Sequence, residues 1–284
     1  MKELLRQAFT QFEKNKISTV DAELLLAHLL GVSRKEIHTQ ALEIPSDQIE
    51  SITAEYKELI GQRLLGRPVQ YITGSAPFRY LDLEVGEGVL IPRPETELLV
   101  DRAIGFLTSM ENSNEAKSVI DLGAGSGAIS IAITSEAALK GLNVSVIAVE
   151  KSEPAVVWLN KNIAKYDLPI RVVVEDVLTA LPGVKADLVL ANPPYIPDDE
   201  KLPQEVEGYE PEIALRGGKV DGMQIPKLFI DSAARLLKPG GIFIMEHHEK
   251  QSDLVKQALK EEFILPQTHA DLTGRDRFTS ARRR

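Results

Sequence analysis

In the first 66 residues, apolar positions recur every three or four residues, which predicts a succession of amphipathic helices. No strand-like alternation of apolar and polar residues interrupts this region. Short polar residues and a glycine stand where helix ends are expected. The candidate caps are Ser18, Ser33 (with Glu36 in capping-box spacing) and Ser46 at N-termini, and Gly31 at a C-terminus. The region therefore reads as a small helical bundle.

Beyond residue 66 the pattern changes. Residues 69–74 and 78–85 are rich in residues that favour strands and are separated by turn residues, which predicts a β-hairpin. Pro94 then suits the first turn of a helix that continues to about Thr108.

From Ser118 onwards, short apolar runs alternate with helical patterns. The expected strands are 118–122, 143–149, 170–174, 186–191 and 241–246, and the expected helices are 127–139, 153–165 and 223–237. This alternation predicts a parallel sheet with helices on both faces, and residues 263–264 and 277–279 add one or two short strands. We expect an α/β protein with a helical domain at 1–67, a β-hairpin linker at 68–88 and a Rossmann-like domain at 89–284.

Composition narrows the classes of function. The chain has 284 residues with 43% hydrophobic and 26% charged residues, as in ordinary globular proteins. The absence of cysteine excludes disulfides, thiolate catalysis and cysteine-ligated metals. A formal net charge of −9 does not indicate a basic surface that would bind long nucleic acids. Because neither a membrane-length apolar run nor a secretory apolar block is evident, we expect a cytoplasmic protein without a membrane partner.

The first chemical motif, VIDLGAGSG, covers residues 119–127. A strand runs into a glycine-rich turn that opens a helix, so a ligand can approach backbone N–H groups. The spacing also fits the dinucleotide fingerprint and does not by itself choose between cofactors. Asp121 favours S-adenosyl-L-methionine, because a carboxylate there would repel a pyrophosphate but suits the cationic amino-acid end of that cofactor. The candidate contacts are Asp121, Gly123, Ala124, Gly125, Ser126 and Gly127.

Two further acids follow strand ends. Glu150 ends the next strand at about the spacing expected of an acid that hydrogen-bonds ribose hydroxyls. Asp176 follows the third strand, where its carboxylate is a candidate acceptor for an adenine amino group, with Val177 packing on the ring. Each of these acids could instead be simply solvated.

The fourth strand of the series ends in Asn192-Pro193-Pro194-Tyr195. Proline cannot continue strand pairing, so one interpretation is a rigid strand stop. The other is a substrate site: the Asn192 side-chain oxygen and the Pro193 carbonyl would accept both N–H bonds of a planar NH₂ group and aim its nitrogen at a reactive methyl. Tyr195 would stack on the planar group, and no strong base is needed because the nitrogen becomes acidic once it is methylated.

Together these motifs resemble class I S-adenosylmethionine-dependent methyltransferases that act on amide or exocyclic amino nitrogens. Across nearly the whole chain, the sequence resembles the bacterial peptide chain release factor glutamine methyltransferases (the PrmC or HemK family). The blocks that carry the resemblance are GRPVQYITG at Gly66–Gly74, VLIPRPETELLV at Val89–Val100, DLGAGSGAIS at Asp121–Ser130, NPPYIP at Asn192–Pro197 and YEPEIALRGGKVDGM at Tyr209–Met223.

The resemblance implies a class I methyltransferase sheet, mostly parallel with an antiparallel C-terminal strand. It implies methylation of the side-chain amide nitrogen of the glutamine in the Gly-Gly-Gln motif of class I release factors, with the N-terminal domain docking that partner. Cofactor contacts would include Glu150, Val177 and Asn192, and the substrate glutamine would lie against residues 192–195. We expect a monomer that does not bind nucleic acid directly.

Two positions depart from the family pattern. Many relatives have aspartate in place of Glu150, and many have Glu-x-Gly where this chain has Glu246-His247-His248-Glu249. Adjacent strand residues point to opposite faces, so His247 and His248 are poorly placed to bind a metal together.

Other functions stay open from the residues alone. Methylation of a ribosomal-protein glutamine would need the same pocket. Methylation of an adenine amino group in DNA or RNA would use similar chemistry, but the net negative charge and the lack of an obvious basic target-recognition segment disfavour it. A dinucleotide dehydrogenase fits the glycines but gives Asn192 no role. A non-catalytic nucleotide-binding protein would have no need of residues 192–195.

Overall fold

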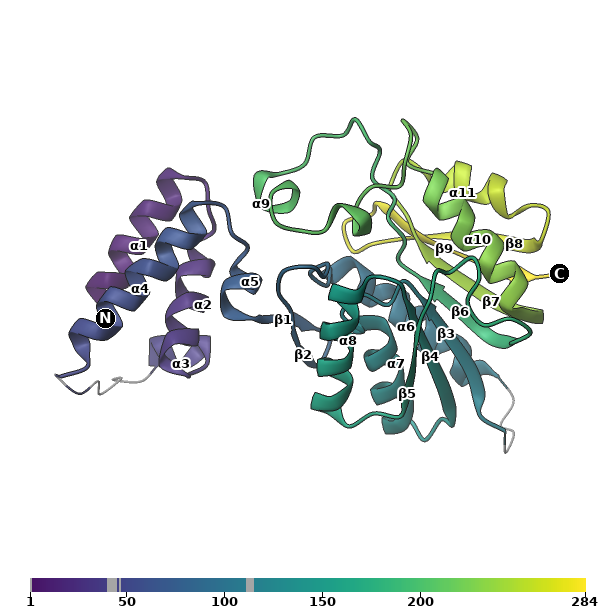
Figure 1. Ribbon diagram of the computed structural model, residues 1–284, viewed down its shortest axis with the longest axis horizontal. Helices are drawn as coiled ribbons and strands as arrows, with labels where there is room; N and C mark the ends of the chain where they lie inside the picture. The colour runs from purple at the N-terminus through teal and green to yellow at the C-terminus, as the bar shows by residue number, and fades with distance from the viewer. Residues whose placement is uncertain (1, 40–44, 46, 111–114) are drawn as a thin grey trace. The chain divides into compact units, whose positions relative to one another are not determined.

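The computed structural model describes residues 2–39, 45, 47–110 and 115–284, which divide into two compact units (Figure 1). The smaller unit contains Met1–Ser75 and the distant segment Leu202–Tyr209. The larger contains Ala76–Lys201 and Glu210–Arg284.

Short helices build the smaller unit, and the sequence pattern predicts the first four of them. They are α1 (Lys2–Lys14), α2 (Thr19–Leu30), α3 (Arg34–Thr39), α4 (Ile49–Leu64), α5 (Val69–Thr73) and α9 (Gln204–Glu207). Their apolar faces meet in a core formed by residues such as Leu5, Phe12, Leu25, Leu26, Tyr56 and Ile60. The periodic apolar positions of the sequence are therefore the buried ones.

Three of the four expected helix ends of this unit are present in the structure. Ser18 accepts a hydrogen bond from the Val20 N–H at 3.3 Å, and Gly31 ends α2 with a φ of 63°. Glu36 accepts from the Ser33 N–H at 2.7 Å, as a capping box requires. These three predictions are confirmed. Ser46, the expected cap of α4, lies outside the described residues.

A buried arginine holds the remote segment in the smaller unit. Arg63 Nε donates to Asp21 Oδ2 at 2.7 Å, and Arg63 Nη2 donates to Glu205 Oε2 at 2.5 Å. The arginine thus joins α2 and α4 to α9, which lies about 140 residues further along the chain than Arg63.

The expected hairpin is present, but its first strand was placed wrongly. Residues 69–73 form the helix α5, and the hairpin consists of β1 (Ser75–Phe78) and β2 (Leu81–Glu84). Val69 and Tyr71 are buried on this helix, and Gly74 closes it with a φ of 72°. Packing against the helical core therefore overrides the strand preference of these residues.

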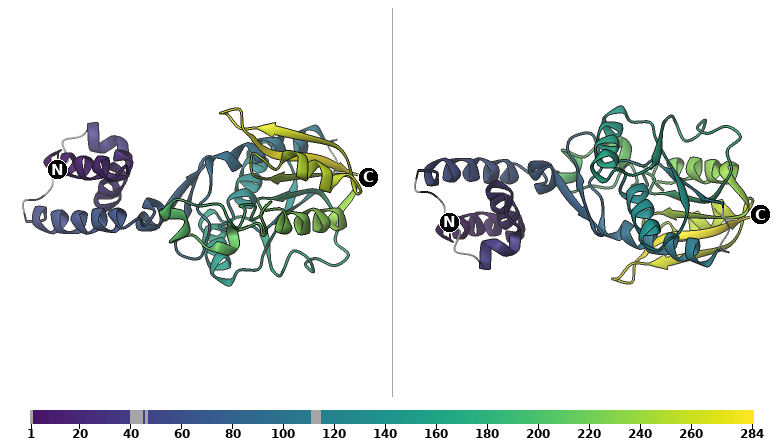
Figure 2. Two further views of the ribbon diagram at one scale, coloured as in Figure 1. Left: turned by 90° about the horizontal axis from the view of Figure 1, so that it is seen from above. Right: turned by 90° about the horizontal axis from the view of Figure 1, so that it is seen from below.

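The larger unit is built on a seven-stranded sheet with the order β5-β4-β3-β6-β7-β9-β8. Its strands are β3 (Lys117–Leu122), β4 (Val144–Glu150), β5 (Ile170–Val174), β6 (Ala186–Ala191), β7 (Leu237–Glu246), β8 (Phe263–Ala270) and β9 (Asp276–Arg283). The first five strands pair in parallel and β9 pairs antiparallel to both neighbours. Figure 2 shows the β8–β9 hairpin in yellow. The predicted mixed sheet is confirmed, and its last two strands are longer than expected.

Helices cover both faces of the sheet. They are α6 (Glu97–Ser109), preceded by the 3-10 turn η1 (Pro94–Thr96), then α7 (Ala128–Leu139), α8 (Glu153–Tyr166), α10 (Gln224–Leu236) and α11 (Ser252–Leu259); a second 3-10 turn, η2 (Glu212–Ala214), lies in a loop. Along β6, Leu188 and Leu190 pack with α6 and α7, whereas Val189 and Ala191 pack with α10 and α11. Both faces are buried, as expected for parallel strands. Among the described residues, none of the helices is long and apolar enough to cross a membrane.

We predict that a side chain at Gly86 disturbs the larger unit. A Cβ there would lie 2.4 Å from Cζ2 of Trp158, the single tryptophan of the chain. Gly86→Ala should therefore lower the free energy of unfolding by about 1–3 kcal/mol and shift the tryptophan emission. Urea unfolding followed by fluorescence measures both.

Gly105→Ala is the matched control, because a Cβ on that exposed residue of α6 meets nothing within 4 Å. It should raise the free energy of unfolding by about 0.5–1 kcal/mol, since glycine is unfavourable inside helices. Equal stabilities of the two variants would contradict the packing described for Gly86.

Candidate active site

The carboxyl ends of four neighbouring strands bring four functional positions into one row. Pairing places Leu122 of β3 beside Val149 of β4 and Ala191 of β6, and Ala191 in turn beside Met245 of β7. The next residue on each strand continues the row, in the order Glu150, Gly123, Asn192 and Glu246. In open α/β sheets, ligands bind at this edge, where the strand order reverses.

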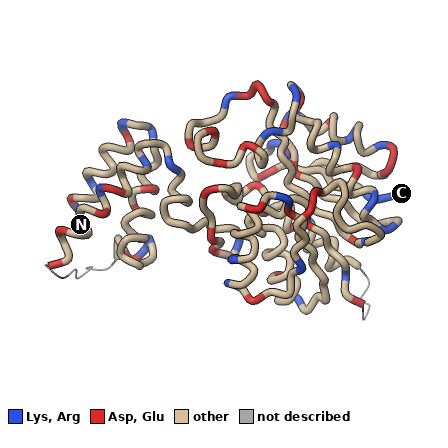
Figure 3. Tube along the Cα trace, viewed as in Figure 1, with Lys and Arg blue, Asp and Glu red and all other residues tan. Residues whose placement is uncertain are grey.

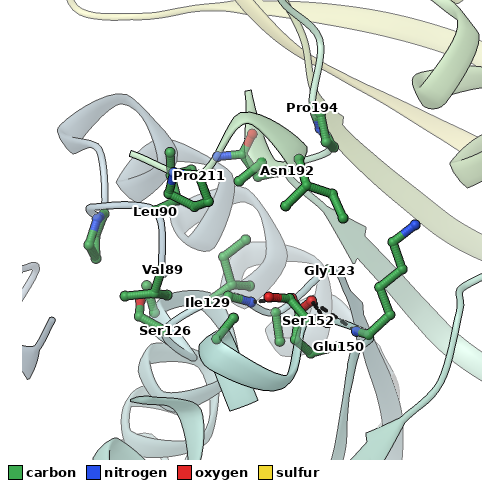
Figure 4. Close-up of a pocket in the computed structure, with 18 of the residues that line it drawn as sticks. Val89, Leu90, Gly123, Ser126, Ile129, Glu150, Ser152, Asn192, Pro194 and Pro211 are labelled. Atoms are coloured by element: carbon green, nitrogen blue, oxygen red, sulfur yellow. Dashed lines mark hydrogen bonds between the residues drawn. The ribbon is translucent and has the colours of Figure 1, made fainter. Parts of the chain in front are cut away.

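A cavity of about 460 Å³ opens beside this row. Figure 4 shows Asn192, Pro194 and Pro211 along one side and Gly123, Ser126 and Glu150 along the other. Its volume is in the range of small-molecule and cofactor sites. The lining residues include Val89, Leu90, Pro92, Arg93, Thr96, Gly123, Ala124, Gly125, Ser126, Ile129, Glu150, Val177, Asn192, Pro194, Ile213 and Phe229.

The glycine-rich turn between β3 and α7 forms the floor of the cavity. Gly123, Gly125 and Gly127 all have positive φ values, which glycine adopts without strain. The N–H groups of Gly123 and Ala124 both donate to the Val149 carbonyl, at 2.8 and 3.0 Å. The turn is thus fastened to β4. Gly123, Ala124, Gly125 and Ser126 line the cavity, whereas Gly127 lies outside its lining.

The Glu150 carboxylate is fixed beside this turn. Its Oε2 accepts from the Gly125 N–H at 2.9 Å, and its Oε1 accepts from the N–H groups of Lys151 and Ser152 at 2.9 and 2.8 Å. A carboxylate has about four acceptor positions, so these three bonds leave capacity for a ligand hydroxyl. The longer side chain of glutamate allows the carboxylate to fold back over its own backbone.

Asp121 lies below the turn and does not line the cavity. Its side chain is fully buried, and Oδ2 accepts from the Ser130 N–H and hydroxyl at 3.1 and 2.6 Å. Among the described residues, Oδ1 has no hydrogen-bond partner. Burial raises the pKa of Asp121 to about 7, although the bonds from Ser130 act in the opposite direction.

Of the pair after β5, only Val177 lines the cavity. The Asp176 carboxylate accepts from Lys151 Nζ at 3.1 Å and from the Leu178 N–H at 3.0 Å. The Leu178 bond is the main cause of the lowered pKa of Asp176, with Lys151 adding to it against the effect of burial.

Asn192 presents its amide at the opposite wall. Its Nδ2 donates to Thr96 Oγ1 at 3.1 Å, and the Thr96 hydroxyl donates to Glu246 Oε2 at 2.6 Å. Pro194 also lines the cavity, whereas Pro193 and Tyr195 lie outside its lining. The Tyr195 hydroxyl donates to Glu246 Oε1 at 3.0 Å, and Gln251 Nε2 donates to the Tyr195 carbonyl at 2.8 Å.

The sequence analysis did not single out Thr96 and Glu246, which the structure joins by hydrogen bonds to Asn192 and Tyr195. Glu246 ends a buried apolar strand just as Glu150 does, so the same signal could have identified it. Thr96 carries no such signal, because its role depends on where η1 lies against the sheet.

The upper rim of the cavity joins two segments far apart in the sequence. Glu210 accepts from the Ile91 N–H at 3.1 Å and from Arg93 Nη2 at 2.6 Å. Residues 88–93 and 211–216 both contribute to the lining. This carboxylate, with a side chain 1% exposed, therefore ties the two segments together.

The two adjacent histidines have separate surroundings. His247 is buried, with Nδ1 2.9 Å from the His248 carbonyl and Nε2 2.9 Å from Thr279 Oγ1. A carbonyl only accepts, so Nδ1 carries the proton and Nε2 accepts from the threonine. Burial lowers the pKa of His247. Within the described part of the chain, no group of three or more histidines and acids is arranged to hold a metal ion.

The sequence and the fold of this chain are similar to those of known proteins. Residues 3–74 match the PrmC N-terminal domain family, and residues 97–206 match the methyltransferase small domain family. The release factor glutamine methyltransferase of Bifidobacterium longum is 38% identical, over 98% of both chains, and that of Streptomyces coelicolor is 39% identical, over 93% of this chain and 90% of its own. Among solved structures, the T. thermophilus 16S rRNA N2 G1207 methyltransferase in complex with AdoMet and guanosine has a TM-score of 0.52 at 21% identity, covering 74% of this chain and 50% of its own. This last likeness shows the fold.

We predict that Asp121 makes stability fall as the pH rises. Its folded pKa of about 7 lies above the ordinary value of 3.8. The native state therefore holds a proton that the unfolded state releases, and this stabilisation is lost as the pH passes through 7. Between pH 5 and pH 8, Asp121→Asn should gain on the order of 2–4 kcal/mol relative to wild type.

Urea unfolding at both pH values measures this difference. Glu261→Gln, at an exposed carboxylate, serves as the control and should track wild type. If Asp121→Asn also tracks wild type, the buried carboxylate does not titrate in this range.

Proposed function

This chain belongs to the family of release factor glutamine methyltransferases, and we propose that it methylates the side-chain amide nitrogen (N5) of the glutamine in the Gly-Gly-Gln motif of class I peptide chain release factors. The proposal rests on the nearly full-length similarity to curated members of the family. The observation that carries its chemistry is the single row in which a cofactor acid, Glu150, and a substrate amide, Asn192, flank one cavity.

The cavity fits S-adenosyl-L-methionine. The glycine turn leaves backbone close to the ligand, the remaining acceptor capacity of Glu150 suits a ribose hydroxyl, and Val177 offers an apolar contact for the adenine. Asp121 Oδ1 is a buried acceptor under the turn, suited to a cationic amino group through water. Contact of Asp176 with the adenine amino group stays a prediction, because its carboxylate is bonded to Lys151.

When bound, the cofactor supplies a methyl group on a sulfonium, so transfer forms one N–C bond, breaks one S–C bond to leave S-adenosyl-L-homocysteine, and releases one proton from the nitrogen to water. Asn192 Oδ1 would accept one N–H bond of the substrate amide. The Pro193 carbonyl stays the predicted acceptor of the other, although Pro193 lies outside the cavity lining. Holding both hydrogens orients the nitrogen and favours its pyramidal form as positive charge develops. The two prolines fix the direction of the carbonyl before the substrate arrives. Stacking by Tyr195 is less favoured than the sequence suggested, because this side chain lies outside the cavity lining.

We assign docking of the release factor to the smaller helical unit, with the protein acting as a cytoplasmic monomer. Direct binding of nucleic acid is disfavoured by the net charge of −9. Figure 3 shows lysine and arginine residues interspersed with aspartate and glutamate along the described chain. A protein that tracks a phosphate backbone instead gathers its basic residues on one face.

The substrate is tested by offering labelled S-adenosylmethionine together with a class I release factor, a ribosomal protein or DNA in parallel. We expect label on the release factor, and none when its Gly-Gly-Gln glutamine is replaced. Label confined to the ribosomal protein or to DNA would overturn the proposed substrate.

Asn192→Ala tests the site. The variant lacks the side-chain acceptor, so kcat should fall by about 100- to 1000-fold, the usual effect of removing one transition-state hydrogen bond. Cofactor affinity, measured by calorimetry, should change little. Asn160→Ala, at an exposed asparagine of α8, is the matched control and should behave as wild type. Near-normal turnover of Asn192→Ala would exclude the two-acceptor arrangement.

A further inference from the structure

Behind the cavity wall, a chain of hydrogen bonds runs from Asn192 to a buried carboxylate. Asn192 Nδ2 is 3.1 Å from Thr96 Oγ1, which is 2.6 Å from Glu246 Oε2. The second oxygen of Glu246 accepts from the Tyr195 hydroxyl at 3.0 Å. Glu246 is 1% exposed and Thr96 is 4% exposed, so the bond between these two side chains is shielded from bulk water.

The direction of each bond in this chain follows from the number of hydrogens available. An ionised carboxylate only accepts, so the single hydroxyl hydrogen of Thr96 must point to Glu246. The Thr96 oxygen can then only accept from Asn192, so the NH₂ end of the amide must face it. Asn192 Oδ1 is thereby left for the cavity, and no described residue donates to it.

Without this constraint, the amide would be free to turn over. An asparagine amide has nearly the same shape in both orientations. If the Thr96 hydrogen were free, it could donate to Oδ1, and the NH₂ end would then face the cavity. Two NH₂ groups would meet there, and the substrate nitrogen would lose its acceptor.

We propose that Glu246, acting through Thr96, is a positioning residue that fixes the Asn192 amide with its oxygen toward the substrate. This inference rests on the proposed function, since it takes Asn192 Oδ1 as the acceptor for the glutamine amide. Glu246 itself does not line the cavity.

The surroundings of Glu246 make the arrangement sensitive to pH. Burial raises the pKa of Glu246 to about 7, and Glu95 of η1 adds to the effect. The bonds from Thr96 and Tyr195 and the charge of Arg277 on β9 act in the opposite direction. A protonated Glu246 must donate to one of its two hydroxyl partners, and the order of the chain is then no longer imposed.

Four variants test the proposal with saturating release factor and cofactor. Glu246→Gln and Thr96→Val should lower kcat by about 100-fold, as expected for a misplaced reacting group, with little change in cofactor affinity. Thr96→Ser keeps the hydroxyl and should keep most of the wild-type kcat. Thr134→Val is the matched control, because Thr134 is a buried threonine whose hydroxyl bonds to the Ser130 carbonyl, outside this chain of bonds; its kcat should be unchanged.

The pH dependence distinguishes positioning from structural support. In wild type, kcat should fall as the pH drops through about 7, where Glu246 takes up a proton. In Thr96→Val and Glu246→Gln, kcat should be low at every pH, without this fall. A variant with low kcat that retains the wild-type fall would overturn the proposal, and so would a loss of cofactor affinity as large as the loss of kcat.

One measurement does not depend on methyl transfer. The side-chain NH₂ signals of Asn192, followed by ¹⁵N NMR, should titrate with a midpoint near pH 7 in wild type and not in Thr96→Val. If no release factor is methylated but this titration is seen, the proposed substrate fails and the positioning by Glu246 stands. If release factor is methylated but the titration is absent or unaffected by Thr96→Val, the positioning fails and the proposed function stands.

Discussion

The order of the strands reverses between β3 and β6. The chain that follows β3 therefore crosses one face of the sheet and the chain that follows β6 crosses the other, and a crevice opens between them at the carboxyl ends of the two strands. The parallel register then decides which residues border the crevice. Gly123 and Asn192 follow directly on residues that pair with each other, Leu122 and Ala191. The backbone hydrogen bonds of the sheet thus hold the glycine-rich turn and the Asn192 amide at a fixed spacing.

The apolar layers keep this spacing rigid. Each central strand contributes alternate residues to two separate cores, one with α6 and α7 and one with α10 and α11. A slip of one residue would exchange the two faces of a strand and move its terminal polar residue out of the row. Because a slip would disrupt both hydrophobic cores and so cost free energy, the packing of the cores holds the residues of the site in position. The register of the strands thus determines both which side chains pack in the two cores and where the polar residues at the strand ends lie.

Much of this could be predicted from the sequence because it is local. Glu150 and Asn192 were identified from their positions at the ends of apolar runs, and the structure places both in the cavity wall. The helix at residues 69–73 was missed because its strand-like composition is overridden by the core it packs on. The contacts of Thr96 and Tyr195 could not be predicted, because their partner Glu246 lies 150 and 51 positions away. Asp176 shows the same limit, since pairing with Lys151 is a property of the folded chain.

The rim held by Glu210 has a consequence for the shape of what can enter. Residues 88–93 and 211–216 border the cavity from two directions and are fastened to each other by one carboxylate. The width of the opening therefore depends on bonds between residues that lie 117 and 119 positions apart in the sequence. A change at Glu210 would alter access to the cavity while leaving every residue of the row at the strand ends in place.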